Sequence, residues 1–288
     1  MNIPTALRAR THRLPLLGVI VACAIAVAAL WPRDESLTPL QRNNVIRIGY
    51  AVEAPYAYID SDGNITGESP EIAKVIVASL GIMDIEWIQT DFDLLISGLL
   101  SERFDVVAAG MFITPERAQH VRFSDPTFHV QPGLLVRSGN PLRLHSYEDS
   151  SGTAGAMVAV ISGAVEESFL RELGVRNEQF IIVPDALTGK TAVVSGLADA
   201  LALSSATVRW VAANDQAGAV EAVDDLTLPD GEAASGWGYG AFVFQPSDHQ
   251  LVDAWNTAQR AFIGRPEHLE LIARFGFTAG ELPGTRTS

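Results

Sequence analysis

Charged residues in the first half of the chain are placed where they could bind a small molecule that carries both charges. Glu53 lies in the stretch EAPYAY, directly after the apolar run Val45–Tyr50, and Arg117 lies in TPER, shortly after the apolar run 106–110. A guanidinium can hold a carboxylate through two parallel hydrogen bonds, and a carboxylate can pair with a cation. We therefore expect Glu53 and Arg117 to bind opposite ends of a zwitterion. The simpler alternatives are that they pair with each other or that Arg117 forms a surface salt bridge.

Three aromatic residues, Tyr56, Phe92 and Phe112, each follow a predicted strand or begin a predicted helix. The faces of aromatic rings attract a delocalised cation, with about 0.5 to 2 kcal/mol for each ring. Core packing is the simpler explanation for any one of these rings taken alone. Their shared position at strand ends favours a cage around a flat cation.

Further candidates in the second half of the chain lie at the starts of predicted helices. In ISGAVEES, Ser162 and Gly163 lead into a helix whose backbone N–H groups could receive an anionic group of a ligand, although Ser162 could also be only a cap. Asp185 begins the next helix in VPDAL, and it is either an N-cap or a polar contact in the cleft, with the cap as the simpler reading. Ser204 and Ser205 follow another predicted strand.

The sequence lacks complete motifs for nucleotide binding, metal binding or hydrolase chemistry. PDALTGKT ends like a phosphate-binding loop, but Pro184 stands where the first glycine is required. GWGYGAF has no following helix and reads as close packing at a strand. The six histidines show no paired metal-ligand spacing, and no Gly-x-Ser-x-Gly elbow occurs. We therefore expect no cofactor, no metal and no catalytic residue.

The elements that must position these residues alternate between short β-rich runs and helical patterns. Ser69 as N-cap, Pro70 at the first helical position and Gly81 after the last one predict a helix. The alternation indicates an α/β fold with a mostly parallel sheet, whose ligand sites lie at the carboxyl ends of strands. The runs are residues 45–50, 70–80, 85–89, 92–100 and 106–110.

A second α/β set begins after the polar stretch 145–155, and its local pattern resembles that of the first. ISGLLSERFDVVAAG leads to Thr114 and Arg117, and VSGLADALALS leads to Thr207 and Arg209. Both read as helix, tight turn, buried strand and next helix, so we infer two similar lobes. A chance match over so few residues is the alternative.

Two further strand-like stretches, 133–137 and 238–244, bracket the second set. If both cross between the lobes, the first lobe comprises residues 44–137 plus 238–283, completed by helices around 251–263 and 266–275. The second lobe then comprises residues 138–237. Two lobes joined by two crossing strands predict a clamshell with a hinge and a ligand cleft.

The net charge and the N-terminal segment indicate which partners are disfavoured and that the chain is exported. The formal net charge is -14, which disfavours nucleic acid and anionic membranes as partners. Residues 1–33 carry arginines and then an apolar run, which predicts an export signal or an uncleaved anchor. Cleavage could follow Ala28, or Cys23 could be lipidated. Each outcome predicts a periplasmic or extracellular protein, and Cys23, as the single cysteine, excludes an intrachain disulfide.

The motifs together resemble the family 3 extracellular solute-binding proteins of ABC importers, and more narrowly the subgroup that binds ectoine and hydroxyectoine. The stretches that carry the resemblance are spread from about residue 44 to 283: IRIGYAVEAPYAY, GESPEIAK, FDVVAAGMFITPER, VRFSDPTF, ISGAVEE, VPDA and GYGAFVF. The resemblance implies a monomeric two-lobed protein that closes on a small zwitterionic solute and delivers it to a membrane permease.

In the ectoine subgroup an aromatic box surrounds the ring of the solute, and the positions that match it here are Tyr56, Phe92 and Phe112. The resemblance also implies that Glu53 engages the ring nitrogens and that Arg117 holds the carboxylate. Position 92 is Phe where the subgroup also has Tyr, so a hydroxyl contact would be missing. The alternatives are a polar amino acid or a betaine-like solute, a cyclohexadienyl-dehydratase-like enzyme with Glu53 as its acid, and a membrane-tethered sensor.

Overall fold

The computed structural model describes residues 34–153, 155–224, 226–227 and 237–284. From Glu35 onward these residues form one compact unit. The predicted export signal, with Cys23, lies outside the described residues. Within the described ranges, no helix has the length and apolar character needed to cross a membrane.

The first sheet places three parallel strands side by side: β1 (Val45–Tyr50), β4 (Asp84–Gln89) and β5 (Val106–Val107). Two short antiparallel strands, β14 (Val243–Phe244) and β6 (Arg122–Phe123), complete the order β4-β1-β5-β14-β6. β1 and β4 pair over their full lengths, from Val45 opposite Asp84 to Tyr50 opposite Gln89.

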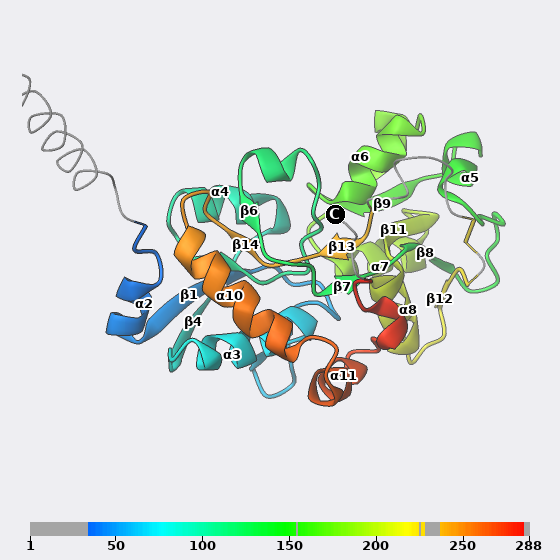
Figure 1. Cartoon of the computed structure of the whole chain (residues 1–288). Helices are drawn as coiled ribbons and strands as arrows, with labels where there is room; N and C mark the ends of the chain where they lie inside the picture. The colour runs from blue at the N-terminus through cyan, green and yellow to red at the C-terminus, as the bar shows by residue number, and fades with distance from the viewer. Residues whose placement is uncertain (1–33, 154, 225, 228–236, 285–288) are drawn as a thin grey trace, which may run out of the picture. The chain divides into compact units, whose positions relative to one another are not determined.

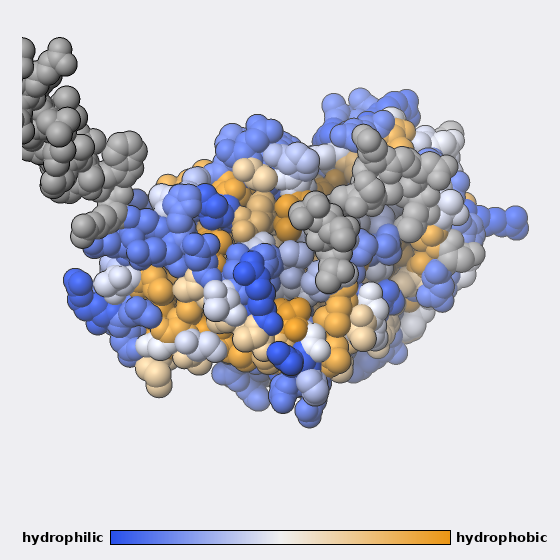
Figure 2. All heavy atoms as spheres, in the orientation of Figure 1, coloured by the Kyte–Doolittle hydropathy of each residue, from blue (hydrophilic) through white to orange (hydrophobic). Residues whose placement is uncertain are grey.

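Helices cover both faces of this sheet, as expected for buried parallel strands. On one face, Ile46 and Ile48 of β1 pack with α3 (Glu68–Ser79) and α10 (His249–Phe262). On the other face, the 3-10 turn η1 (Phe92–Leu94) and α4 (Leu95–Leu100) form a second cluster. α10 buries only one side, and Figure 2 shows hydrophilic and hydrophobic residues interspersed over its visible face.

The second sheet has the order β10-β9-β11-β8-β12. Its parallel strands are β9 (Val158–Ile161), β10 (Phe180–Val183) and β11 (Ala200–Ser204), and β8 (Pro132–Arg137) lies antiparallel between β11 and β12 (Val220–Ala222). Successive residues Leu134 and Leu135 point to opposite clusters, because neighbouring side chains of a strand face opposite sides. The covering helices are α5 (Tyr147–Gly152), α6 (Val165–Glu172), α7 (Ala186–Ser195) and α8 (Ser205–Ala213).

We call the first sheet with α3, α4, α10 and α11 the first lobe, and the second sheet with α5, α6, α7 and α8 the second lobe. Between the sheets, β7 (Phe128–His129) pairs antiparallel with β13 (Tyr239–Gly240), so two strands run between the lobes (Figure 1). The remaining elements are α2 (Thr38–Asn43), β2 (Tyr58–Ile59), β3 (Ile65–Thr66), η2 (Arg117–Gln119), η3 (Asn177–Gln179), α11 (Pro266–Ala273) and η4 (Ala279–Glu281).

Two local expectations differ from the structure. The predicted crossing strand 133–137 lies in β8 and is paired on both sides within the second sheet, so the chain leaves the first sheet before Pro132 and not at residue 137. The helix predicted to start after Ser69 begins at Glu68, with Gly67 at its N-cap. Gly67 has φ of +125°, and a Cβ there would collide with the backbone carbonyl of Tyr56, so glycine allows the loop to pack against the helix start.

Candidate functional site

A cavity of about 20 Å³ lies where the carboxyl ends of first-lobe strands meet the helix starts of the second lobe. Five of the seven residues predicted from the sequence line it, together with Gly110, Ala164, Val165, Glu166 and Ser204. The five are Glu53, Tyr56, Phe92, Phe112 and Arg117. The structure therefore brings these five together, while their role in binding stays a prediction.

Glu53 lies three residues past β1, in a tight loop closed by backbone hydrogen bonds between Glu53 and Ala57 at 2.8 and 3.0 Å. Its Oε1 accepts a hydrogen bond from the Thr207 hydroxyl at 2.8 Å. Burial raises the pKa of Glu53 to about 7, and the bond from Thr207 opposes that rise. Because Thr207 lies in α8, this carboxyl group ties the first lobe to the second.

Tyr56 extends the same connection. The residue is 2% exposed, and its hydroxyl donates to Ser204 Oγ at 2.8 Å. Ser204 in turn donates to Thr207 Oγ1 at 3.1 Å, and it also caps α8 by accepting the Thr207 N–H. A continuous chain of hydrogen bonds thus runs from Tyr56 through Ser204 and Thr207 to Glu53, and it crosses between the lobes twice.

Arg117 begins the 3-10 turn η2, where the sequence predicted an α-helix, and Thr114 Oγ1 accepts its backbone N–H at 3.1 Å as a cap. Its guanidinium donates to the Phe112 carbonyl at 2.8 Å and to the Gly163 carbonyl at 2.9 Å, and it lies 5.6 Å from the centre of the Phe92 ring.

Burial lowers the pKa of Arg117 to about 10, so the group stays charged at neutral pH. In the described part of the chain it has no carboxylate within ion-pair distance. The expectation that Arg117 only pairs with Glu53 or forms a surface salt bridge is therefore not what the structure shows. A half-buried guanidinium with neutral partners is suited to an anionic ligand group.

The structure places Gly163 beside Arg117 but changes the role expected for it. Its carbonyl accepts from Arg117, while its N–H donates to Glu167 Oε2 at 3.3 Å. The N–H that was predicted to bind an anionic ligand group is therefore already hydrogen-bonded to Glu167 in this structure. Gly163 has φ of +75°, and a Cβ there would meet Asp93 Cβ at 3.1 Å, so glycine permits the close approach of the two lobes.

Asp185 is not brought to this cavity. Its Oδ1 accepts the Thr188 N–H at 2.7 Å, which makes it the N-cap of α7, the simpler of the two readings. It lines a different cavity of about 290 Å³ with Leu187 and Trp210. Asp185 is therefore the one predicted site residue that lies apart from the others in the structure.

The three aromatic residues form walls that are anchored in the cores. Tyr56 and Phe112 lie nearly perpendicular, with ring centres 6.5 Å apart. Tyr56 also stacks on Phe128 at 4.9 Å, and Phe112 contacts Trp237 at 5.1 Å. Phe92 is half-buried and packs against clusters of both lobes. A cage around a cation stays a prediction, but these rings present rigid surfaces to one cavity.

Glu166 is a cavity residue that the sequence analysis missed. It lies in the first turn of α6, is 4% exposed, and lines the cavity with Glu53 and Arg117. Burial and the nearby Glu53 raise its pKa to about 8, against the opposing effect of Arg117. The signal available was spacing: Glu166 lies four residues before the buried Leu170, on the apolar side of the helix.

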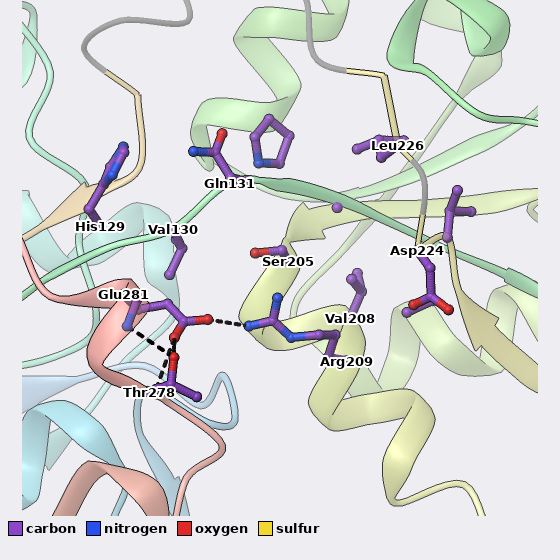
Figure 3. Close-up of a pocket in the computed structure, with 15 residues that line it drawn as sticks. His129, Val130, Gln131, Ser205, Val208, Arg209, Asp224, Leu226, Thr278 and Glu281 are labelled. Atoms are coloured by element: carbon purple, nitrogen blue, oxygen red, sulfur yellow. Dashed lines mark hydrogen bonds and ion pairs between the residues drawn. The ribbon is translucent and has the colours of Figure 1, made fainter. Parts of the chain in front are cut away.

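A larger cavity of about 440 Å³ holds none of the seven residues predicted to bind the solute. It is lined by residues around the crossing strand, by α8 and by the C-terminal turn η4 (Figure 3). At its edge Arg209 forms an ion pair with Glu281 at 2.8 Å, and Glu281 also bonds to Thr278 (Figure 3). Ser205 lines this cavity and not the smaller one. Within the described residues no cluster of three or more potential metal ligands occurs.

Comparisons with known proteins show which proteins this chain resembles. A probable amino-acid ABC transporter periplasmic-binding protein, y4tE of Sinorhizobium fredii (strain NBRC 101917 / NGR234), is 32% identical over 265 residues, covering 91% of this chain and 87% of the relative. The lysine/arginine/ornithine-binding periplasmic protein of Escherichia coli (strain K12) is 25% identical over 222 residues, covering 74% of this chain and 80% of the relative.

Among solved structures, EhuB in complex with hydroxyectoine superposes with a TM-score of 0.76 at 29% identity, covering 86% of this chain and 95% of EhuB. The likeness confirms the predicted α/β clamshell, with two lobes and two crossing strands. The family model of the bacterial extracellular solute-binding proteins, family 3, matches residues 46–277. With two lobes that line a shared cavity and a family model that matches most of its length, the chain belongs to family 3 of the bacterial extracellular solute-binding proteins.

Proposed function

We propose that this protein is the solute-binding component of an ABC importer and that its solute is ectoine or 5-hydroxyectoine. The observation that carries the proposal is the meeting of Arg117, Glu53 and three aromatic rings at one cavity between the lobes. Ectoine is a cyclic amidine with a carboxylate, so it carries a flat delocalised cation and an anion. The likeness to EhuB, solved with hydroxyectoine, supports this choice.

Each end of such a solute has a matching group. Arg117 already directs its N–H groups toward acceptors at the cavity, the Phe112 and Gly163 carbonyls, and a carboxylate would be a stronger acceptor for the same guanidinium. The delocalised ring would lie against the rings of Phe112 and Tyr56, with Glu53 as its counter-charge. A compact ammonium would gain less from π faces, because its charge is better met by point acceptors.

Binding requires the lobes to move. A cavity of about 20 Å³ has room for about one water and not for a ring of this size. The pair β7 and β13 joins the lobes, and opening about it would separate Glu53 and Tyr56 from Thr207 and Ser204. The proposed cycle is therefore opening, entry of the solute and closure around it.

The partner and location follow from the same proposal. Residues 1–33 would export the chain across the cytoplasmic membrane. On the outer side of that membrane, the closed protein with its bound solute would deliver the solute to a permease in the membrane. We propose a monomer, with no nucleic acid as a partner. A purely binding role agrees with the family, and recovery of unchanged prephenate and arogenate after incubation would test it against the dehydratase alternative.

A polar amino acid is the second candidate, and Glu166 favours it. A second buried carboxyl beside Glu53 could accept another cationic group, as a basic amino acid would provide. The likeness to a lysine/arginine/ornithine-binding protein gives this candidate support comparable to that for ectoine.

Thermal-shift measurements with ectoine, 5-hydroxyectoine, arginine, lysine, glutamine and glycine betaine test both candidates. A ligand at 100 times its Kd stabilises the folded state by about 2.7 kcal/mol, which is readily detected. Larger stabilisation by either ectoine compound than by any amino acid at pH 6 is the expected result. Stabilisation by amino acids alone would refute the ectoine proposal and retain the second candidate.

A further inference from the structure

Glu166 is the buried acid of the cavity whose carboxyl group lacks a partner from another residue. It is 4% exposed and lines the cavity, and its carboxyl group meets only its own backbone N–H. Within the described residues no other side chain donates a hydrogen bond to it. Glu53, in contrast, already accepts from Thr207. A buried carboxylate without a counter-charge is costly, so Glu166 must either hold a proton or receive a cation.

The charges around the cavity do not balance for a simple zwitterion. Two carboxyl groups, Glu53 and Glu166, share the site with one guanidinium, Arg117. A zwitterion pairs with Arg117 and one carboxylate, which leaves the second carboxylate without a counter-charge. A solute with one carboxylate and two cationic groups pairs with all three.

We propose that Glu166 contacts the solute and selects it by net charge: a protonated Glu166 admits a zwitterion, and an ionised Glu166 requires a second cationic group. This inference rests on the proposed function, because it takes the small cavity as the solute site. It assigns a specificity-determining role to Glu166 of α6, a residue that is part of neither the aromatic box nor the Arg117 contact with the solute carboxylate.

The groups around Glu166 support a change of protonation near neutral pH. Glu53 and Tyr56 face it from the first lobe, Arg117 faces it from η2, and Tyr147 faces it from α5. The strand β9, which packs against α6, contributes only apolar residues. With the pKa of Glu166 at about 8, small changes in pH alter its charge.

Linkage gives the size of the effect of Glu166 alone; ionisation of Glu53, with its pKa of about 7, changes the affinity of both solutes equally and cancels in their ratio. If a zwitterion binds only when Glu166 is protonated, this contribution to its affinity falls by about twofold between pH 6 and pH 8. If a solute of net charge +1 binds only when Glu166 is ionised, its affinity rises by about 50-fold over the same interval. The preference for the cationic solute over the zwitterion therefore rises by about 100-fold.

Calorimetry with L-arginine and ectoine at pH 6 and pH 8 tests this, using wild type, Glu166→Gln and the control Glu172→Gln on the exposed side of the same helix. We expect wild type and Glu172→Gln to show the rise in preference and Glu166→Gln to lose most of it. If only one probe binds, the difference between its pH dependence in wild type and in Glu166→Gln is read, because Glu53 contributes equally in both proteins. An equal pH dependence in wild type and Glu166→Gln would overturn the proposal.

Failure of the proposed function gives a different result, namely that neither probe binds wild type at either pH. The inference is then judged without ligand, from the melting temperatures of wild type and Glu166→Gln between pH 5 and pH 9. A titrating Glu166 predicts that wild type loses stability relative to the variant as pH rises through about 8. A constant difference between the two proteins would overturn it.

Discussion

Replacing Thr207 with valine removes one hydroxyl and leaves the shape of the side chain almost unchanged. That hydroxyl donates to Glu53 across the lobes at 2.8 Å and accepts from Ser204 at 3.1 Å. The Thr207 backbone N–H would still bond to the Ser204 cap, so α8 should remain intact. The change therefore acts mainly on the connection between the lobes.

The size of the effect follows from the kind of bond that is lost. A hydrogen bond to a charged group contributes about 1.5 to 3 kcal/mol. At pH 8, where Glu53 with its pKa of about 7 is mostly ionised, the ratio of closed to open molecules should fall by about 10- to 150-fold. Thr207→Ser keeps the hydroxyl and serves as the matched control.

Small-angle X-ray scattering of the ligand-free protein measures this directly. Thr207→Val should show a larger radius of gyration than wild type and Thr207→Ser, because more molecules have separated lobes. Identical scattering from all three proteins would show that the hydrogen-bond chain does not hold the lobes together, and the reasoning would fail.

Three further predictions concern binding and stability. Arg117→Ala should abolish the thermal shift given by the solute, whereas Arg260→Ala, which removes an exposed ion pair with Asp125, should leave it unchanged; equal shifts in both would contradict the assigned grip. Asp185→Ala should lower the free energy of unfolding by about 1 kcal/mol through loss of the α7 cap, without a change in solute affinity measured by calorimetry. Burial raises the pKa of three carboxyl groups, those of Glu53, Glu68 and Glu166. Denaturant unfolding should therefore show a free energy of unfolding that is higher at pH 5 and falls as the pH rises through 7 to 8. A free energy of unfolding that increases over this range would show that these groups are not buried in the protonated form.

The sequence by itself determined the features that depend on local pattern. Alternating β-rich and helical runs predicted parallel strands. Asp185 in VPDAL could be predicted as an N-cap because its partner, the Thr188 N–H, lies only three residues further along the chain. Glu53 and Arg117 could be placed together because the carboxyl ends of parallel strands meet at one edge.

Only the tertiary structure decided which groups meet across the lobes. Thr207 reaches Glu53 from 154 residues away, and no local signal encodes that partner. The sequence analysis did not single out Glu166, which the tertiary packing buries beside Glu53. The same holds for β8, whose place in the second sheet depends on antiparallel pairing with β11 and β12. Hydrogen-bond partners and burial are properties of the folded chain, whereas caps and periodicity are properties of a few consecutive residues.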